Sequence, residues 1–377
     1  KLSMKNLKIK TDALIVGSGP VGCVLAERLS NDLNLKCLIV EKRDHVAGNC
    51  FDLKNNKGLL YHKYGPHYLR FKNKKTFNYL SKFTKWIKGD YIVKSYVDKK
   101  LYNFPININT LEKLFKLKFK TSEEAKKFLD SKKIKIKNPK NSEEFILSQV
   151  GKEIYEKFYK NYSKKQWGIH PRLLNKSVLG RVPIRLNRDN FYVNEKLKFM
   201  PKDGYTLMFK NMISHKNINI KLNTDFKKIK KKIEYKILIY TGPVDEYFDY
   251  KFGKLEWRSL KFKFQSFKKK YLQECVQYNF PNDFKFTRKV EIKHVTKQKS
   301  NYTIISKEYP TKHGDPFYPI NTKKNAGLYL KYLKLVKKLE KKQIYFEGRL
   351  ATYRYINTDE VIENALNLYK KIKKNLS

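Results

Sequence analysis

The sequence predicts an α/β fold with an inserted helical domain and an antiparallel sheet domain. Three observations lead to this prediction. Near the start of the chain, two short apolar runs flank a glycine-rich turn and a helical pattern, the arrangement of a βαβ unit. The middle of the chain carries apolar residues at three- and four-residue spacing, as helices do, whereas residues 260–307 contain alternating segments typical of antiparallel strands.

The βαβ unit covers residues 11–43. Residues 13–16 are continuously apolar, as expected of a parallel strand buried on both faces. Gly17-Ser18-Gly19-Pro20-Val21-Gly22 then forms a turn that opens a helix, and a second apolar run ends at Glu41. Glycines at this spacing allow a tight turn, a close approach to a pyrophosphate and close helix packing, and the acidic residue can accept from ribose hydroxyls. The pattern predicts a Rossmann-like dinucleotide-binding domain.

The residues after this acidic position favour FAD over NAD as the dinucleotide. Glu41-Lys42-Arg43 continues into His45-Val46-Ala47-Gly48-Asn49. In FAD enzymes a small glycine-bearing loop at this place passes beside the pyrophosphate and the flavin, whereas in NAD dehydrogenases the second strand simply turns back. We therefore expect FAD.

The remaining elements interleave with this domain. Residues 142–150 and 152–162 have helical spacing, residues 235–240 predict a strand that leads into Thr241-Gly242, and residues 358–373 predict a final helix. We expect the chain to return at its end to the dinucleotide domain. The predicted segments are the FAD-binding domain in three parts (1–71, 198–259 and 321–377), a mainly helical insertion with substrate-binding residues (72–197) and an antiparallel sheet domain (260–320).

The charge balance is strongly basic, with 84 Lys and Arg against 35 Asp and Glu. The lysines are spread from end to end, which favours a generally lysine-rich surface over a nucleic-acid or anionic-membrane partner; a basic binder of such polyanions is the alternative. Only eleven of the cations are arginines. Because a guanidinium grips a phosphate or carboxylate with two donors, these few arginines are better site candidates than any lysine.

The sequence shows neither a targeting segment nor a cysteine motif. No run approaches the roughly 18 apolar residues of a membrane span, and no signal peptide is visible. Cys23, Cys37, Cys50 and Cys275 form no CxxC pair, which favours buried, reduced thiols. No Ser-His-Asp triad or metal cluster is evident. These features predict a cytoplasmic enzyme or binder that is not integral to the membrane.

Beyond these patterns, the chain resembles the UDP-galactopyranose mutase family from about Asp12 to Leu368. The resemblance rests on the order and spacing of many short stretches rather than on a single motif. They are Val16-Gly17-Ser18-Gly19, Glu41-Lys42-Arg43, Gly48-Asn49, Lys63-Tyr64-Gly65-Pro66-His67, Asn103-Phe104-Pro105, Tyr162-Ser163-Lys164-Lys165-Gln166-Trp167-Gly168, Arg181-Val182-Pro183-Ile184-Arg185, Gly204-Tyr205-Thr206, Tyr240-Thr241-Gly242-Pro243, Arg258-Ser259-Leu260, Lys307-Glu308-Tyr309-Pro310, Tyr318-Pro319 and Gly348-Arg349-Leu350-Ala351.

The resemblance implies an isomerase that interconverts the pyranose and furanose forms of a nucleotide sugar for surface glycan biosynthesis. It implies that the reduced form of FAD is active, that flavin N5 attacks the anomeric carbon and displaces UDP, and that the ring opens and recloses in an N5–sugar adduct. The cofactor then carries the covalent chemistry, and the protein supplies placement and electrostatics. A homodimer is also implied. The default substrate is UDP-galactopyranose.

The resemblance also assigns site residues. Those implied for catalysis are Arg181 and Arg288, which hold the diphosphate, and His67 at the edge of the flavin. Those implied for substrate binding are Phe158, Tyr159, Tyr162, Trp167, Asn103, Tyr192, Asn279, Tyr318 and Tyr355. Those expected to bind the cofactor are Gly17, Gly19, Pro20, Val21, Gly22, Glu41, Lys42, Arg43, Gly48, Asn49, His67, Thr241, Gly242, Gly348, Arg349 and Tyr355.

Three departures from the family pattern leave the sugar open. Arg70 stands where the family often has a second histidine, Asn357 replaces a common acidic residue, and the loop between Asn279 and Arg288 is one residue short. Arg70 and Asn357 are therefore added to the expected substrate-binding residues. UDP-N-acetylgalactosamine and a dTDP-6-deoxyhexose are alternative substrates, and a flavin oxidoreductase of the amine-oxidase-like class is an alternative function.

Overall fold

The centre of the fold is a five-stranded parallel sheet. The computed structural model describes residues 8–376. In this sheet the strands lie in the order β11 (Ile218–Lys221), β3 (Cys37–Val40), β2 (Ala13–Val16), β13 (Ile237–Tyr240) and β19 (Ile344–Phe346). Every neighbouring pair is parallel. The strands predicted from the apolar runs at 13–16, 36–40 and 235–240 are confirmed.

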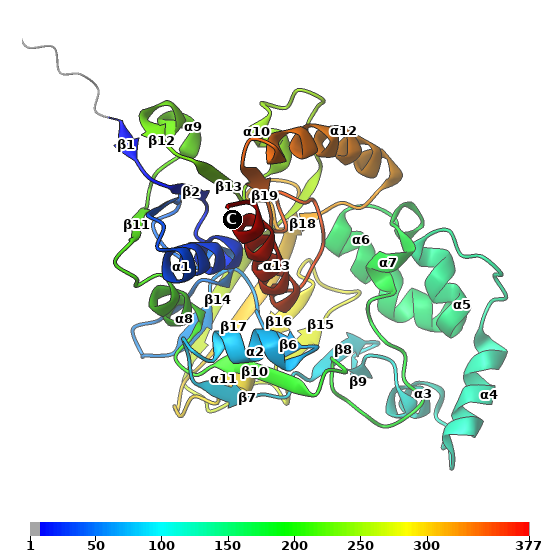
Figure 1. Ribbon diagram of the computed structural model, residues 1–377. Helices are drawn as coiled ribbons and strands as arrows, with labels where there is room; N and C mark the ends of the chain where they lie inside the picture. The colour runs from blue at the N-terminus through cyan, green and yellow to red at the C-terminus, as the bar shows by residue number, and fades with distance from the viewer. Residues whose placement is uncertain (1–7, 377) are drawn as a thin grey trace, which may run out of the picture.

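Helices cover both faces of this sheet, which explains its continuous apolar runs. Ala13, Ile15 and Ile239 pack on one face with α1 (Pro20–Leu33) and α13 (Thr358–Leu376). Leu14 and Leu238 pack on the other face with α12 (Lys323–Glu340). Figure 1 shows α13, the last helix of the chain, beside α1, the first. The chain thus returns to its first domain, as predicted.

A mixed seven-stranded sheet forms the second layer. Its order is β18 (Tyr318–Pro319), β14 (Trp257–Phe267), β17 (Thr303–Thr311), β16 (Arg288–Val290), β15 (Gln277–Asn279), β8 (Val93–Val97) and β9 (Lys100–Phe104). All pairs are antiparallel except β15 with β8. The antiparallel segments expected within 260–307 are confirmed as β14 to β17. The strands β8 and β9 come from the stretch 72–197 that was expected to be mainly helical.

Three smaller sheets complete the strands. The three-stranded antiparallel sheet contains β6 (Leu69–Phe71), β10 (Leu197–Pro201) and β7 (Trp86–Lys88). The two pairs are the hairpin of β4 (Asp52–Lys54) with β5 (Leu60–His62) and the parallel pair of β1 (Ile9–Lys10) with β12 (Ile233–Glu234). The domain boundaries given above stay a prediction.

A group of helices lies to one side of the two large sheets (Figure 1). It comprises α3 (Ile108–Phe115), α4 (Ser122–Lys132), α5 (Ser142–Ile154), α6 (Asn161–Trp167) and α7 (Lys176–Leu179), with a π-helical turn, Tyr155–Lys160, between α5 and α6. The first four residues of a helix lack intrahelical acceptors for their N–H groups, so polar caps fix where helices begin. Asn107, Thr121, Asn141 and Asn175 serve in this way. Short helices elsewhere are α2 (Lys74–Leu80), α8 (Tyr205–Met212), α9 (Phe226–Ile229), α10 (Val244–Tyr247) and α11 (Lys293–Thr296).

Two further features concern the cysteines and the helices. All four cysteines are unpaired and buried, as predicted from their spacing. Within residues 8–376 no helix has both the length and the apolar character needed to cross a bilayer.

Candidate active site

The turn between β2 and α1 has no room for side chains. Gly17 has φ +102°, and a Cβ there would lie 2.2 Å from Thr241 Oγ1. A Cβ on Gly22 would lie 2.0 Å from the Gly17 carbonyl oxygen, and one on Gly48 would lie 2.9 Å from Gly19 Cα. The start of α1 has no side-chain cap. A helix start with uncapped N–H groups and a bare backbone suits an anionic pyrophosphate.

The carboxylate of Glu41 is fixed at the end of β3. One oxygen accepts hydrogen bonds from the Ser18 backbone N–H and hydroxyl, both at 2.8 Å, and the other accepts from the Arg43 N–H at 2.9 Å. Two carboxylate oxygens offer about four acceptor positions. The arrangement therefore leaves acceptor capacity for a hydroxyl of a bound ribose.

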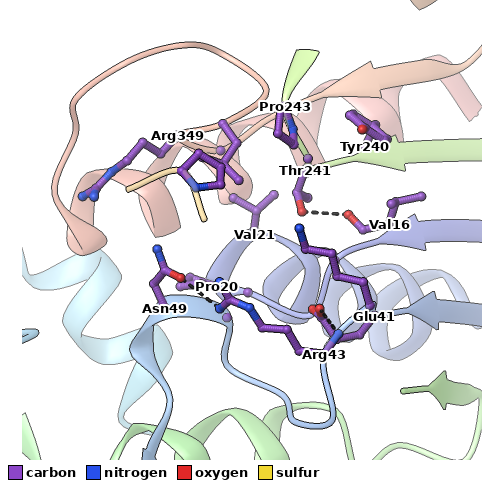
Figure 2. Close-up of a pocket in the computed structure, with 18 of the residues that line it drawn as sticks. Val16, Pro20, Val21, Glu41, Arg43, Asn49, Tyr240, Thr241, Pro243 and Arg349 are labelled. Atoms are coloured by element: carbon purple, nitrogen blue, oxygen red, sulfur yellow. Dashed lines mark hydrogen bonds between the residues drawn. The ribbon is translucent and has the colours of Figure 1, made fainter. Parts of the chain in front are cut away.

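These residues belong to an elongated cavity. Glu41 and Arg349 lie at opposite ends of it, with Pro20 and Val21 between them (Figure 2). The cofactor residues expected from the sequence that line it are Gly17, Gly19, Pro20, Val21, Glu41, Lys42, Arg43, Gly48, Asn49, His67, Thr241, Gly242, Gly348 and Arg349. Gly22 lies beneath the turn, and Tyr355 lines a neighbouring cavity instead. The ribose acceptor, the bare turn and the long shape fit a dinucleotide such as FAD.

The sequence missed part of this lining. Thr224 to Lys227 follow β11, and Pro243 and Glu246 follow β13. The carboxyl ends of parallel strands meet at one edge of the sheet, where ligands bind. In the sequence, this edge is indicated by the glycine motif after β2, the acid after β3 and Thr241-Gly242 after β13. Any further strand assigned to the same sheet predicts more lining residues at its end.

A second cavity adjoins the first and contains most of the expected substrate residues. Those that line it are Arg70, Phe158, Tyr159, Tyr162, Trp167, Arg181, Tyr192, Asn279, Arg288, Tyr318, Tyr355 and Asn357. Asn103 does not. It lies on β9 next to Phe104, which lines the cavity, and successive strand residues point to opposite faces. The structure therefore turns the Asn103 side chain away from this cavity.

Arg288 is held from behind by a buried acid. Its Nε donates to the Tyr162 hydroxyl at 2.7 Å, and its Nη1 lies 3.4 Å from Glu308 Oε2. Glu308 is 0% exposed. Burial raises the pKa of Glu308, and the neighbouring guanidinium of Arg288 opposes that rise. Because removing one member of a buried ion pair leaves an uncompensated charge, Arg288 and Glu308 depend on each other.

Arg181 is held by neutral groups. Its Nη1 donates to the Tyr355 carbonyl at 3.2 Å and its Nη2 to Asn357 Oδ1 at 2.8 Å. The guanidinium lies over the Tyr355 ring, 3.9 Å from the centroid. Asn357, where the family often has an acid, thus orients Arg181 without neutralising it. Arg70 has a more distant acidic partner, Glu195 Oε1 at 3.9 Å.

Aromatic rings form another wall of the second cavity. Trp167, Tyr318 and Tyr355 pack around one another with centroid separations of 5.2 to 5.9 Å. The sequence missed Gln277, which donates to Asn279 Oδ1 at 2.7 Å. Residues two apart in a strand share a face. The prediction for Asn279 on β15 could therefore have included Gln277.

The two cavities meet at four residues that line both: Asn49, His67, Arg349 and Thr358. The backbone N–H of His67 donates to His62 Nδ1. The ring Nδ1 of His67 lies 3.0 Å from the Gly65 carbonyl oxygen. That carbonyl can only accept, so His67 Nδ1 carries the proton. Burial, followed by His62 and Arg349, lowers the pKa of His67 to about 3. A neutral imidazole is the expected form where the cavities join.

The paired histidines predict a loss of stability in mild acid. Burial also lowers the pKa of His62 to about 3. The unfolded chain, with an ordinary histidine pKa near 6.5, therefore binds more protons between about pH 3 and 6.5, so stability falls as the pH falls through this window. Between pH 7 and pH 5, His62 alone should cost about 2 kcal/mol. Chemical denaturation of wild type and His62→Gln at both pH values tests this; an equal pH dependence in both proteins would contradict it.

The fold and the two joined cavities define a dinucleotide-binding α/β protein that holds a second, arginine-rich ligand site beside its cofactor. Comparison with known proteins agrees. A family model described as UDP-galactopyranose mutase matches residues 157–355, and one described as NAD(P)-binding Rossmann-like domain matches residues 15–83.

Individual relatives match along nearly the whole chain. A probable UDP-galactopyranose mutase of Klebsiella pneumoniae is 35% identical over 360 residues, which cover 94% of this chain and 92% of the relative. A dTDP-fucopyranose mutase of Escherichia coli is 34% identical over 369 residues, covering 94% and 96%. A crystal structure of reduced UDP-galactopyranose mutase shares the fold, with a TM-score of 0.78 at 17% identity over 97% of this chain and 96% of that one.

The chain belongs to the UDP-galactopyranose mutase family. It is accordingly an isomerase that interconverts pyranose and furanose forms of a nucleotide sugar, and its Rossmann-like domain is the FAD-binding domain of that family. This assignment sets aside the amine-oxidase-like oxidoreductase alternative.

Proposed function

We propose that this enzyme converts UDP-galactopyranose to UDP-galactofuranose and that it requires reduced FAD. The observation that carries the proposal is the junction of the two cavities at Asn49, His67, Arg349 and Thr358, where a flavin in one cavity would meet a sugar in the other. When bound in reduced form, FAD supplies the nucleophile that displaces UDP from the anomeric carbon. A solved structure that shares this fold is of a reduced UDP-galactopyranose mutase.

The protein's own contribution is to hold the diphosphate and shield the reacting centre. Arg181 and Arg288 offer guanidinium groups that stabilise the negative charge that accumulates on the diphosphate as UDP leaves. Tyr318 and Tyr355 add hydroxyl donors beside them. Phe158 and Tyr159, with Tyr162 one turn later, provide a stacking surface for the base. His67, neutral at the junction, offers Nε2 as an acceptor for a sugar or flavin N–H or O–H group.

The sugar is the least constrained part of the proposal. Relatives of similar identity are a probable UDP-galactopyranose mutase and a dTDP-fucopyranose mutase. UDP-N-acetylgalactosamine and a dTDP-6-deoxyhexose are therefore the substrates to compare with UDP-galactopyranose. Action in the cytoplasm as a homodimer, for surface glycan biosynthesis and without a nucleic-acid partner, stays a prediction from the sequence.

Arg70 provides a test of sugar selection. Arg70→His restores the residue that the family often has at this position. We expect it to change the ratio of kcat/KM values between two nucleotide sugars by about tenfold, the effect of one altered polar contact, while inhibition by UDP stays the same because Arg181 and Arg288 are intact. Steady-state kinetics with UDP-galactopyranose and dTDP-fucopyranose measure this ratio. Arg188→His is the control, since Arg188 is exposed, pairs with Glu112 and lines neither cavity. An unchanged ratio would remove Arg70 from sugar selection.

The reaction itself is tested by chromatography of UDP-galactopyranose incubated with the purified flavoprotein, with and without dithionite. A new isomeric UDP-sugar that forms only under reducing conditions is the expected result. Absence of that product with a fully reduced flavin, in an enzyme that isomerises another nucleotide sugar in the same assay, would overturn UDP-galactopyranose as the substrate and retain the reaction type.

A further inference from the structure

The outer face of α12 is strongly basic. All six of its lysines are exposed: Lys323, Lys324, Lys331, Lys334, Lys337 and Lys338. At 100° per residue they fall within an arc of about 140°, spread along about 20 Å of helix. Leu330 lies inside this arc and is 56% exposed. Figure 1 shows α12 on the outside of the molecule, beyond the large parallel sheet.

The charge on this face is almost uncompensated. The helix has one acidic residue, Glu340, which pairs with Lys371 of α13. Lys324 pairs with Glu256 at 3.4 Å, and the other five lysines form no ion pair with any residue in 8–376. In α4, by contrast, Glu123, Glu124 and Asp130 accompany the lysines. The exposed side of α12 is therefore almost purely basic, whereas α4 carries charges of both signs.

An exposed aromatic turn packs beside this helix. Tyr250 and Phe252 are 38% and 36% exposed, and Lys254 Nζ lies 4.9 Å from the Tyr250 ring centroid. The Phe252 N–H donates to the Tyr332 hydroxyl at 3.1 Å, and that hydroxyl donates to the Gly253 carbonyl at 2.6 Å. Because Tyr332 is on the buried side of α12, these bonds fix the turn against the helix. The turn is therefore joined to the side of α12 that faces away from the lysines.

We propose that this surface docks on an anionic lipid bilayer. It is called the α12 face and consists of Lys323, Lys331, Lys334, Lys337, Lys338 and Leu330. A helix that lies in a membrane interface carries lysines that reach the anionic headgroups and apolar side chains that enter the acyl boundary.

The composition of the face favours lipid over nucleic acid. It contains no arginine, the residue that reads guanine edges and grips phosphates with two donors. Its exposed apolar residue is Leu330, an aliphatic side chain that gains from entering a hydrocarbon phase but offers no ring on which a base could stack.

Vesicle co-sedimentation at physiological ionic strength tests the proposal. We expect the FAD-loaded protein to bind phosphatidylglycerol-rich vesicles and not vesicles of phosphatidylcholine alone. Changing Lys331, Lys334, Lys337 and Lys338 together to Gln should weaken binding at least about tenfold, since each lysine adds to the attraction. Leu330→Ser should weaken vesicle binding roughly fivefold or more. The binding that remains should be electrostatic and should be lost at high salt.

The matched control removes the same charge from another exposed lysine cluster. Lys228, Lys230, Lys231 and Lys232 are exposed and have no exposed apolar neighbour among them. Changing these four to Gln should leave vesicle binding within about twofold of wild type. Equal loss in both quadruple variants would show that diffuse charge, not this face, binds the vesicles and would overturn the proposal. So would absence of vesicle binding, with or without binding to a DNA duplex. Retained FAD and isomerase activity show that each variant is folded.

Discussion

Arg181→Ala is expected to lower kcat/KM by at least about a hundredfold while FAD remains bound, because it removes a positioned donor from the group on which charge develops. Arg181 lines only the second cavity, so the cofactor loses no contact. Its two neutral acceptors, Tyr355 O and Asn357 Oδ1, aim the guanidinium without reducing its charge. Arg181→Lys should recover little activity, since an ammonium cannot hold both acceptors and a phosphate in one plane.

The measurement is steady-state turnover together with the flavin-to-protein absorbance ratio. Arg172→Ala, at an exposed position that lines neither cavity, is the matched control and should leave both values unchanged. Full activity in Arg181→Ala would exclude this residue from the diphosphate site.

Gly17→Ala is expected to remove most of the bound FAD. The residue has φ +102°, a region that side chains disfavour, and its new Cβ would lie 2.2 Å from Thr241 Oγ1. That hydroxyl is itself fixed, because it donates to the Val16 carbonyl at 2.7 Å (Figure 2). The turn must shift at the point where a pyrophosphate would approach the start of α1. FAD affinity should fall at least about tenfold, measured by flavin content and by titration of the apoprotein.

Two further variants separate steric overlap from backbone strain. Gly253 has nearly the same φ, +104°, with nothing within 4 Å of its Cβ position. Gly253→Ala should therefore keep its FAD and lose only about 1 kcal/mol of stability. Adding Thr241→Ala to Gly17→Ala removes the overlapping oxygen and should restore part of the FAD content. If Gly17→Ala binds FAD as wild type does, the glycine is not needed for this turn.

The scarcity of arginine in the sequence was an informative signal. Five of the eleven arginines line the two cavities: Arg43, Arg70, Arg181, Arg288 and Arg349. Of the far more numerous lysines within residues 8–376, only Lys42 and Lys227 do. A side chain that the composition disfavours is retained where its planar, two-donor geometry is needed. The scarcity of arginine does not identify Glu308 as a site residue, because nothing in the surrounding sequence shows that this acid is buried behind Arg288.

The sequence by itself determined the features that depend on local backbone requirements. A dinucleotide-binding unit is specified by the apolar run at β2, the glycine turn and the acid at the end of β3. Each of these features acts on the conformation or chemistry of its own short segment. Only the tertiary structure decided which distant segments meet. The parallel pairing of β8 with β15, the contact of Arg181 with Asn357 and the orientation of Asn103 away from the cavity depend on packing between segments far apart in the chain. The α12 face emerged in the same way, because only the burial of one side of the helix leaves its lysines and Leu330 together in solvent.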